Sequence, residues 1–228
     1  MKSQKFRHEI KHYINSSDYL AIRSRLKHIA YPDRFAVNDG SYTIRSLYFD
    51  NLNNKALLEK INGVNQREKF RIRLYNHDPS YIRLEKKSKL NSLCSKDSVL
   101  MTREQCQQII RGDIRSLLAS DHPLLQELYA KMRYQLLRPR TIVEYTREAY
   151  CYPAGNVRIT FDSNLRSGLL SRDFFNPELP SLSITSRGQI ILEVKYDEFL
   201  PALIRDIIQT NERRSTSISK YAACRIYG

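Results

Sequence analysis

Short segments in which apolar and charged residues alternate recur along the chain. In residues 69–75, a period of two places Lys69, Arg71 and Arg73 on one face and apolar side chains on the other. The same alternation occurs in residues 7–13, 83–89, 143–147, 158–162 and 191–195. These segments predict antiparallel strands whose sheet has one apolar face and one basic face that carries a few carboxylates.

The remaining pattern predicts an α+β protein of one domain over residues 1–228. Further strand patterns cover residues 42–50, 67–75, 81–89, 140–150, 156–163 and 189–196. Helical spacing covers residues 16–30, 55–61 and 201–210, and residues 102–131 carry two helices divided at Asp121-His122-Pro123. Residues 90–97 have the composition of a polar loop.

A sheet with one charged face either leaves that face open to water or closes into a barrel that turns it inward. Any single alternating strand is typical of an open, solvated sheet. Six segments with the same cationic bias favour a closed barrel, for which about eight strands suffice. A basic lumen of this kind requires carboxylates or an anionic ligand to offset its repulsion.

Charge and cysteine usage restrict the partner and the compartment. Lys and Arg total 38 against 24 Asp and Glu, a net charge of +14, which favours an anionic partner such as phosphate, nucleic acid or an acidic membrane. The four cysteines form no C-x-x-C pair and no secretory signal is evident, so we expect a cytoplasmic protein. No apolar run reaches the roughly 18–20 residues that span a bilayer, so membrane association would need a partner protein.

The basic face carries the residue types that phosphoryl transfer needs. Arg makes bidentate contacts with phosphoryl oxygens, and Lys adds a mobile point charge. The carboxylates on the same face are the donors that a hard divalent cation prefers. They are Glu9, Glu85, Asp162 and Glu193. Metal, phosphate and cations together favour phosphoryl transfer, which depends on positioning and charge stabilisation.

Taken in the order in which they occur along the chain, these segments also resemble a known family. Residues 7–13, 42–50, 69–75, 84–87, 143–150, 157–162 and 192–200, with Ser219-Lys220-Tyr221, are similar to the successive signatures of the VTC domain. This is the polyphosphate polymerase domain of the triphosphate tunnel metalloenzyme superfamily. The resemblance implies a CYTH-like antiparallel β-tunnel with flanking helices, a divalent metal (Mn or Mg), and transfer of the ATP γ-phosphate to polyphosphate or pyrophosphate.

The resemblance also implies roles for individual residues. Lys11, Arg71, Arg73 and Glu193 match the catalytic set, in which Glu193 coordinates the metal. All of the following match phosphate-binding positions of the tunnel: Lys11, Arg45, Arg71, Arg73, Lys87, Lys96, Arg147, Arg158, Lys195 and Lys220. Glu9 and Glu85 are further candidate metal ligands.

Two positions depart from the family's patterns. Ser217 stands where the eukaryotic polymerases carry a second C-terminal lysine. Arg7 stands where the E-x-E-x-K signature of the hydrolase branch has a glutamate, which favours the polymerase-like branch.

A polyphosphate polymerase is therefore the leading hypothesis. A triphosphate or nucleoside-triphosphate hydrolase of the same fold and a non-catalytic polyphosphate binder are the alternatives. Nucleic acid is not expected, because the basic residues alternate with apolar ones inside strands and no aromatic stacking platform is evident. The oligomeric state is left open.

Overall fold

The computed structural model describes residues 6–36, 40–91, 93–186, 188–209 and 217–228. Its strands are β1 (His8–Ile14), β2 (Tyr31–Pro32), β3 (Ser41–Asp50), β4 (Gln66–Tyr75), β5 (Asp78–Leu90), β6 (Leu93–Met101), β7 (Arg138–Tyr152), β8 (Val157–Ser167), β9 (Leu182–Ser183) and β10 (Ile190–Tyr196). Its helices are α1 (Ser16–Leu26), α2 (Lys55–Ile61), α3 (Arg103–Arg111), α4 (Arg115–Leu118), α5 (Pro123–Tyr134), the 3₁₀ turn η1 (Ala154–Asn156), α6 (Ala202–Ile208) and α7 (Lys220–Ile226).

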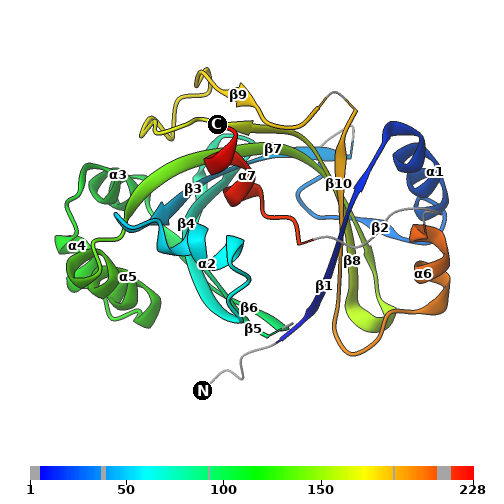
Figure 1. Ribbon diagram of the computed structural model, residues 1–228, viewed down its shortest axis with the longest axis horizontal. Helices are drawn as coiled ribbons and strands as arrows, with labels where there is room; N and C mark the ends of the chain where they lie inside the picture. Colours follow the sequence, from blue (N-terminus) through cyan, green and yellow to red (C-terminus); the bar gives the residue numbers. More distant parts are fainter. Residues whose placement is uncertain (1–5, 37–39, 92, 187, 210–216) are drawn as a thin grey trace.

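The strands form one strongly curved antiparallel sheet (Figure 1). Eight of them follow the order β1-β10-β8-β7-β3-β4-β5-β6, while β2 pairs with β7 and β9 with β8. The edge strands β1 and β6 come together at a bridge between Arg7 and Cys94, whose two backbone hydrogen bonds measure 3.1 and 3.3 Å. The predicted α+β fold is confirmed, but the barrel is not fully closed: this bridge is the pairing between its edges in the described part of the chain.

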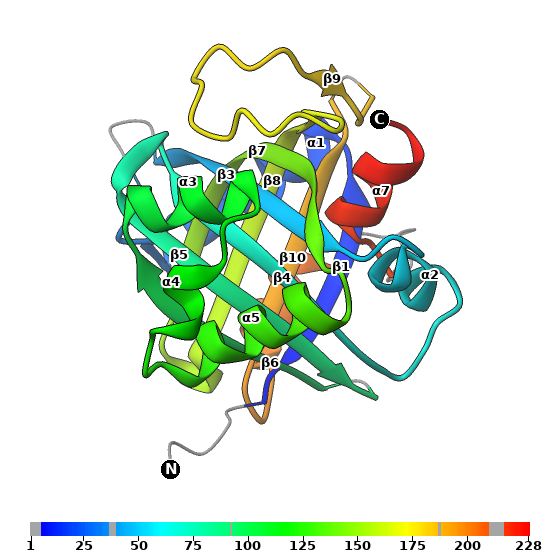
Figure 2. The ribbon, with the colours of Figure 1, turned by 90° about the vertical axis from the view of Figure 1, so that its left-hand side faces the viewer.

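The apolar face of the sheet lies outside, where helices cover it. In Figure 2, α3, α4 and α5 lie across one side of the sheet. There Phe70, Ile72 and Leu74 of β4 pack into a core cluster with Leu128 of α5. On the opposite side, α1 and α6 cover β8 and β10 and bury Ile204 with them. Each such side chain contributes about 1.5–3 kcal/mol on full burial, so the basic face turns inward.

Local capping residues fix where helices begin. Thr102 and Gln105 form a capping box at the start of α3, with each side chain accepting a hydrogen bond from the other residue's backbone N–H. Helix α1 begins at Ser16, because Asn15 and Asp18 form a second capping box just before it. No helix among the described residues is long and apolar enough to cross a membrane.

Several predicted boundaries were wrong. The helix expected over residues 16–30 ends at Leu26, because the chain then extends into β2 and pairs with β7. The region 102–131 contains three helices rather than two. The helix expected over residues 201–210 is α6, and residue 210 lies outside the described residues.

Several elements were missed, among them the short strands β2 and β9 and the turn η1. Residues 90–97 were expected to be a loop, but most of them belong to β6, which pairs with β5 along its whole length. The sequence pattern does not predict this strand, because polar residues such as Ser95, Lys96 and Asp97 follow one another without alternating with apolar ones. Helix α7 was not predicted either, although Ser219 caps it by accepting a hydrogen bond from the backbone of Ala222.

Asp50 at the end of β3 holds α2 and α7 beside the tunnel. It is only 1% exposed. Its Oδ1 accepts a hydrogen bond from the backbone N–H of Ala56 at 2.9 Å, and its Oδ2 accepts from Leu57 at 3.2 Å. The same Oδ2 accepts from the hydroxyl of Tyr221 in α7 at 2.6 Å. One carboxylate therefore accepts hydrogen bonds from backbone N–H groups in the first turn of α2 and also from α7, so it holds the two helices together.

We expect Asp50→Ala to lower the free energy of unfolding by roughly 2–4 kcal/mol, because it leaves buried donors without an acceptor. Tyr221→Phe removes one of these bonds and should cost about 1 kcal/mol. Urea unfolding followed by circular dichroism measures both. Equal losses in the two variants would contradict the anchoring role of Asp50.

Candidate active site

The inward faces of the strands enclose a cavity of about 340 Å³. Among the described residues, its charged lining consists of eleven cations and two carboxylates: Arg7, Lys11, Lys69, Arg71, Arg73, Lys87, Lys96, Arg147, Arg158, Lys195, Lys220, Glu9 and Glu193. We call this space the main cavity. Its excess of positive charge favours an anionic ligand.

Nine of the ten residues predicted to bind phosphate line the main cavity. They are Lys11, Arg71, Arg73, Lys87, Lys96, Arg147, Arg158, Lys195 and Lys220. They come from seven different strands and from α7, so only the folded sheet brings them together. Their role in binding phosphate stays a prediction.

Arg71 and Arg73 are held by a carboxylate beneath them. Arg71 lies opposite Glu85 in the β4–β5 register, and its Nε and Nη2 lie 2.8 and 2.7 Å from Glu85 Oε2. Arg73 Nη1 lies 3.6 Å from the same oxygen, and its Nε donates to Ser46 Oγ at 3.0 Å. Fixed guanidinium groups of this kind can offer their remaining N–H groups to phosphoryl oxygens.

The structure does not bring Glu85 to the cavity wall. It is 1% exposed, and its other oxygen, Oε1, lies 3.1 Å from Lys96 Nζ. Burial alone would raise the pKa of Glu85, but Arg71, Arg73 and Lys96 outweigh it and hold that pKa well below its usual range. Since Glu85 does not line the main cavity, whereas Glu9 and Glu193 do, we correct its predicted metal-binding role to that of a buried counter-ion.

Lys11 and Glu9 lie on the opposite wall, in β1. Lys11 Nζ lies 2.6 Å from Glu9 Oε1 and donates to the carbonyl of Ile218 at 3.3 Å. Glu9 Oε2 lies 2.6 Å from Lys87 Nζ across the gap between the edge strands. Burial opposes ionisation of Glu9, yet Lys11, Lys87 and Lys195 lower its pKa far below the usual range. The two lysines are thus held by one carboxylate.

Glu193 in β10 faces Lys11 directly in the strand register. Its Oε1 lies 2.8 Å from Lys195 Nζ. Its Oε2 comes no closer than 3.9–4.0 Å to Lys11, Arg147 and Lys220 in the described part of the chain. This oxygen is surrounded by positive charge but is not bound tightly by any cation, so it remains available to a ligand.

The donor set fits a divalent cation that the substrate helps to hold. No group of three or more His, Cys, Asp or Glu residues that could hold a metal occurs among the described residues. Magnesium commonly takes only one or two carboxylates and completes its shell with phosphate oxygens and water. Glu193 is the principal candidate ligand, and Glu9 the second, because both line the main cavity.

Two more arginines are held by carboxylates behind them. Arg147 makes a bidentate pair with Asp162, at 2.6 and 2.7 Å, and Lys220 Nζ lies 2.5 Å from the same carboxylate. Arg158 pairs with Asp33 at 2.5 Å and donates to the hydroxyl of Tyr42 at 2.8 Å. Burial opposes ionisation of Asp162, but its two cations keep its pKa below the usual value.

Arg45 is the predicted phosphate ligand that the structure places elsewhere. It is 2% exposed and does not line the main cavity. Its neighbour Ser46 contacts Arg73 inside the tunnel, so strand alternation turns Arg45 outward. There its Nε donates to Glu144 at 2.5 Å, and its Nη groups donate to the carbonyls of residues 174, 176 and 177. Arg45 therefore fastens this segment to the outside of the sheet.

Sequence reasoning did not assign a role to Lys69 or Tyr48. Lys69 shares the inward face of β4 with Arg71, and this pattern was the signal that could have identified it. Tyr48 accepts a hydrogen bond from Arg71 Nη1 at 2.7 Å, and Lys69 Nζ lies 5.7 Å from its ring centroid. Burial, reinforced by the charges of Lys87 and Lys11, lowers the pKa of Lys69 to about 7.

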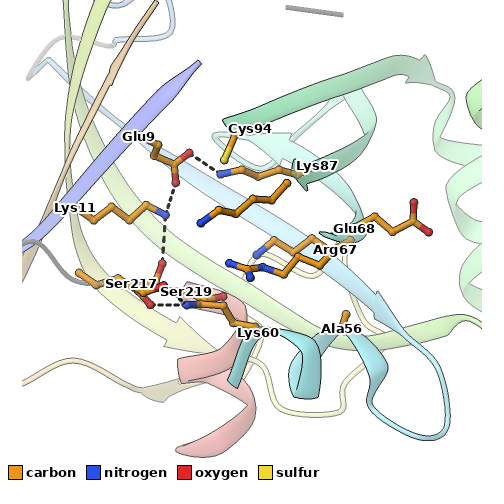
Figure 3. A pocket seen from close by; sticks show the side chains of 13 residues that line it. Glu9, Lys11, Ala56, Lys60, Arg67, Glu68, Lys87, Cys94, Ser217 and Ser219 are labelled. Carbon is orange, nitrogen blue, oxygen red and sulfur yellow. Dashed lines mark hydrogen bonds and ion pairs between the residues drawn. The ribbon is translucent and has the colours of Figure 1, made fainter. Parts of the chain in front are cut away.

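A second cavity of about 280 Å³ adjoins the main cavity (Figure 3). We call it the side compartment. Residues that line both spaces are Glu9, Lys11, Lys69, Lys87, Cys94 and Ser219. The side compartment adds Lys60 from α2, Arg67 from β4 and Lys89 from β5, none of which was predicted as a site residue.

Comparison with known families agrees with this geometry. The family model of the VTC domain matches residues 6–226. The chain belongs to the VTC domain family. The sequence comparison finds no similar protein among curated ones.

Solved structures share the fold of this VTC domain. A putative adenylyl cyclase from Hippeastrum, HpAC1, described as having a dominant triphosphatase activity, is 11% identical, with a TM-score of 0.57 over 96% of this chain and 94% of that chain. A putative adenylate cyclase from Bacillus halodurans is 12% identical, with a TM-score of 0.47 over 85% of this chain and 80% of that one. The first likeness identifies the fold as that of triphosphate tunnel proteins.

We expect Arg45→Leu to destabilise the protein by about 3 kcal/mol, because Glu144 and three carbonyls lose their donor. Its affinity for tripolyphosphate should stay unchanged, whereas Arg71→Leu should lose about 10-fold or more. Urea unfolding and isothermal titration calorimetry separate the two effects. Weakened tripolyphosphate binding in folded Arg45→Leu would contradict its placement outside the tunnel.

Lys69 should make tripolyphosphate binding weaken as the pH rises from 6 to 9. An anion binds the protonated lysine, so affinity is highest below the pKa of about 7 and falls as the ammonium loses its proton. In Lys69→Arg the guanidinium stays charged over this pH range. The part of the decline in tripolyphosphate affinity that is due to Lys69, up to about 10-fold, should therefore vanish. Lys195, with a pKa lowered by burial to about 8, titrates in both proteins, as does the ligand. Identical pH profiles from calorimetry would refute the role of Lys69.

Proposed function

We propose that this VTC domain is a metal-dependent polyphosphate polymerase that transfers the γ-phosphate of ATP to a polyphosphate or pyrophosphate acceptor. The observation that carries the proposal is the pair of adjoining cationic spaces: one is lined by fixed arginines and by Glu193, and the other opens beside it. Transfer between two phosphate chains needs cationic walls for both the donor and the acceptor.

The arginines position the donor triphosphate. Arg71 and Arg73 are fixed by Glu85, and Arg147 is fixed by Asp162, so their free N–H groups need little reorganisation when phosphate binds. Phosphoryl transfer depends mainly on such positioning and on charge stabilisation. These groups would hold the phosphates in line with the acceptor.

Lys11 and Glu193 lie where charge would be neutralised during transfer. A bound Mn²⁺ or Mg²⁺ would neutralise phosphate charge, and Glu193, with Glu9, would hold it. Lys11 stays protonated, because Glu193 and Glu9 outweigh burial and raise its pKa above the usual value. Its ammonium can therefore stabilise a phosphoryl oxygen but does not act as a base.

The reaction needs no nucleophilic side chain. A terminal phosphate oxygen of the acceptor forms a bond with the γ-phosphorus, while the bond from that phosphorus to the β,γ-bridging oxygen breaks. ADP leaves with that oxygen, and the acceptor chain is one phosphate longer. Since this chemistry consumes ATP and the four cysteines are free thiols, we assign the protein to the cytoplasm.

A triphosphatase acting in the same cavity is the second candidate. It is favoured by the fold shared with HpAC1, whose description names a dominant triphosphatase activity. In that case water would replace the acceptor phosphate, and orthophosphate would be released instead of added to a chain. The products therefore distinguish the two candidates.

The test is a turnover assay with ATP, pyrophosphate primer and Mn²⁺, in which a gel resolves polyphosphate from orthophosphate. We expect chain growth that EDTA abolishes and that Arg71→Ala and Glu193→Gln slow by about 100-fold or more. Arg133→Ala, which removes an exposed charge from α5, is the matched control and should retain full activity. Orthophosphate without chain growth would indicate the triphosphatase, and absence of any turnover would refute both enzymes.

A further inference from the structure

Aromatic side chains gather at one end of the tunnel. Tyr42 lies near the start of β3, Tyr75 is the last residue of β4, and Tyr81 lies near the start of β5. Because neighbouring strands of this sheet are antiparallel, these three positions share one end of it. The side compartment lies towards the other end, where Arg67 is near the start of β4 and Lys89 near the end of β5. The two ends of the tunnel therefore differ in chemistry: one is aromatic and the other is cationic.

The three tyrosines point into the tunnel. Tyr75 lines the main cavity. The rings of Tyr42 and Tyr81 lie 6.1 and 6.0 Å from that of Tyr75, measured between centroids. The hydroxyl of Tyr42 accepts a hydrogen bond from Arg158 at 2.8 Å, and burial raises the pKa of this tyrosine to about 12. Three neighbouring strands thus contribute to one aromatic wall inside the tunnel.

Phe35 occupies the centre of this wall. It lies in the turn that follows β2, and its ring stacks on Tyr75 with the centroids 4.4 Å apart and the planes 1° from parallel. The rings of Tyr42 and Tyr81 lie 5.9 and 5.8 Å from it and are tilted. On the face that Tyr75 leaves open, Arg34 Cζ lies 4.8 Å from the ring centroid. We call Phe35 and the turn of residues 33–36 that carries it the aromatic plug.

Asp33 fastens the aromatic plug to the sheet. Its backbone N–H donates to the carbonyl of Ala149 in β7 at 2.9 Å, and its own carbonyl accepts from the backbone N–H of Ala36 at 3.0 Å. Its Oδ1 accepts from the backbone N–H of Phe35 at 3.1 Å, and its Oδ2 lies 2.5 Å from Arg158 Nη2. The backbone on both sides of Phe35 is therefore held in place, so the ring is fixed in its position.

The aromatic plug closes this end of the tunnel to phosphate. In the described part of the chain, the lining of the main cavity reaches Tyr75 but not Phe35. A phenyl ring offers no hydrogen-bond donor to a phosphoryl oxygen, and moving a charged group into an apolar space without a partner is costly. A phosphate chain therefore has no favourable path past Phe35.

The same contacts argue against a nucleobase site at this end. Tyr75 covers one face of the Phe35 ring, and Arg34 covers the other. A nucleobase binds an aromatic side chain by stacking on a free face. Because Phe35 has none, the arrangement fits closure of the tunnel rather than binding of a base.

Closure at one end decides which part of a linear chain can bind. A tunnel that is open at both ends lets a chain pass through it, so many protein molecules can occupy one long chain. A tunnel that is closed at one end accepts only a chain terminus, so each chain end holds at most one protein molecule. The number of protein molecules bound per chain distinguishes the two arrangements.

We propose that Phe35 makes this protein bind the ends of polyphosphate chains and exclude their internal segments. Phe35 is a specificity-determining residue, because it acts by closing the tunnel and not by contacting the reacting atoms. The inference rests on the proposed function for the identity of the anion, but it holds whether the main cavity transfers phosphate, hydrolyses it or only binds it.

The test counts protein molecules per polyphosphate chain by analytical ultracentrifugation, using two narrow length fractions of which one is several times longer. The salt concentration is one at which Arg71→Ala/Arg73→Ala no longer binds, so that only binding in the tunnel is counted. We expect the natural protein to bind at most one molecule per chain end on both fractions. In Phe35→Ala the number should rise in proportion to chain length. The matched control, Phe199→Ala, removes an exposed ring elsewhere and should behave as the natural protein does.

Asp33→Asn, which removes the ion pair that fastens the aromatic plug, is the second variant if circular dichroism shows that Phe35→Ala is unfolded. Its number per chain should also rise with chain length. A number that rises with length in the natural protein would overturn the closed end, even if chain growth were observed. Counts limited to chain ends in every folded variant would overturn the role of Phe35, and absence of binding to both fractions would overturn the inference through its anion. End-limited binding that Phe35→Ala abolishes, in a protein without turnover, would support the closed end and refute the proposed function.

Discussion

The interaction on which this structure depends is the pairing of buried carboxylates with the cations of the tunnel. An unpaired charge inside a protein costs several kcal/mol. Glu85 lies beneath Arg71 and Arg73, and Asp162 lies beneath Arg147 and Lys220. Each carboxylate thus serves at least two cations and holds them from behind. The sheet can turn a basic face inward because these acids lie between the cations and the outer core.

The sheet supplies this pairing through its register. Arg71 faces Glu85, Arg147 faces Asp162, and Lys11 faces Glu193 across neighbouring strands. A one-residue slip would turn every such side chain to the other face. The apolar outer face and the helices that cover it fix the register, so the hydrophobic core and the charged lumen specify the same alignment.

The carboxylates do not neutralise every cation of the tunnel, and this matters for the binding of a ligand. Lys69 has no carboxylate partner among the described residues, and its lowered pKa reflects the cost of keeping it charged in the tunnel. A phosphate chain would offset that cost. Stability and binding are therefore opposed at the same side chains, as is common where a site is built to receive a charged ligand.

The sequence by itself determined most of the long strands, their antiparallel arrangement and the faces on which most of the cations lie, because alternation with a period of two is a local property. It missed β6, in which this alternation is absent. The same alternation was enough to predict that Arg45 lies outside the tunnel, because Arg45 shares a face of β3 with Leu47 and Phe49 of the core. Only the tertiary structure decided that Glu85 lies beneath the arginines and that Lys60 of α2 enters the side compartment. Those positions depend on strand register and on the docking of a helix by Asp50, which are contacts between residues far apart in the chain.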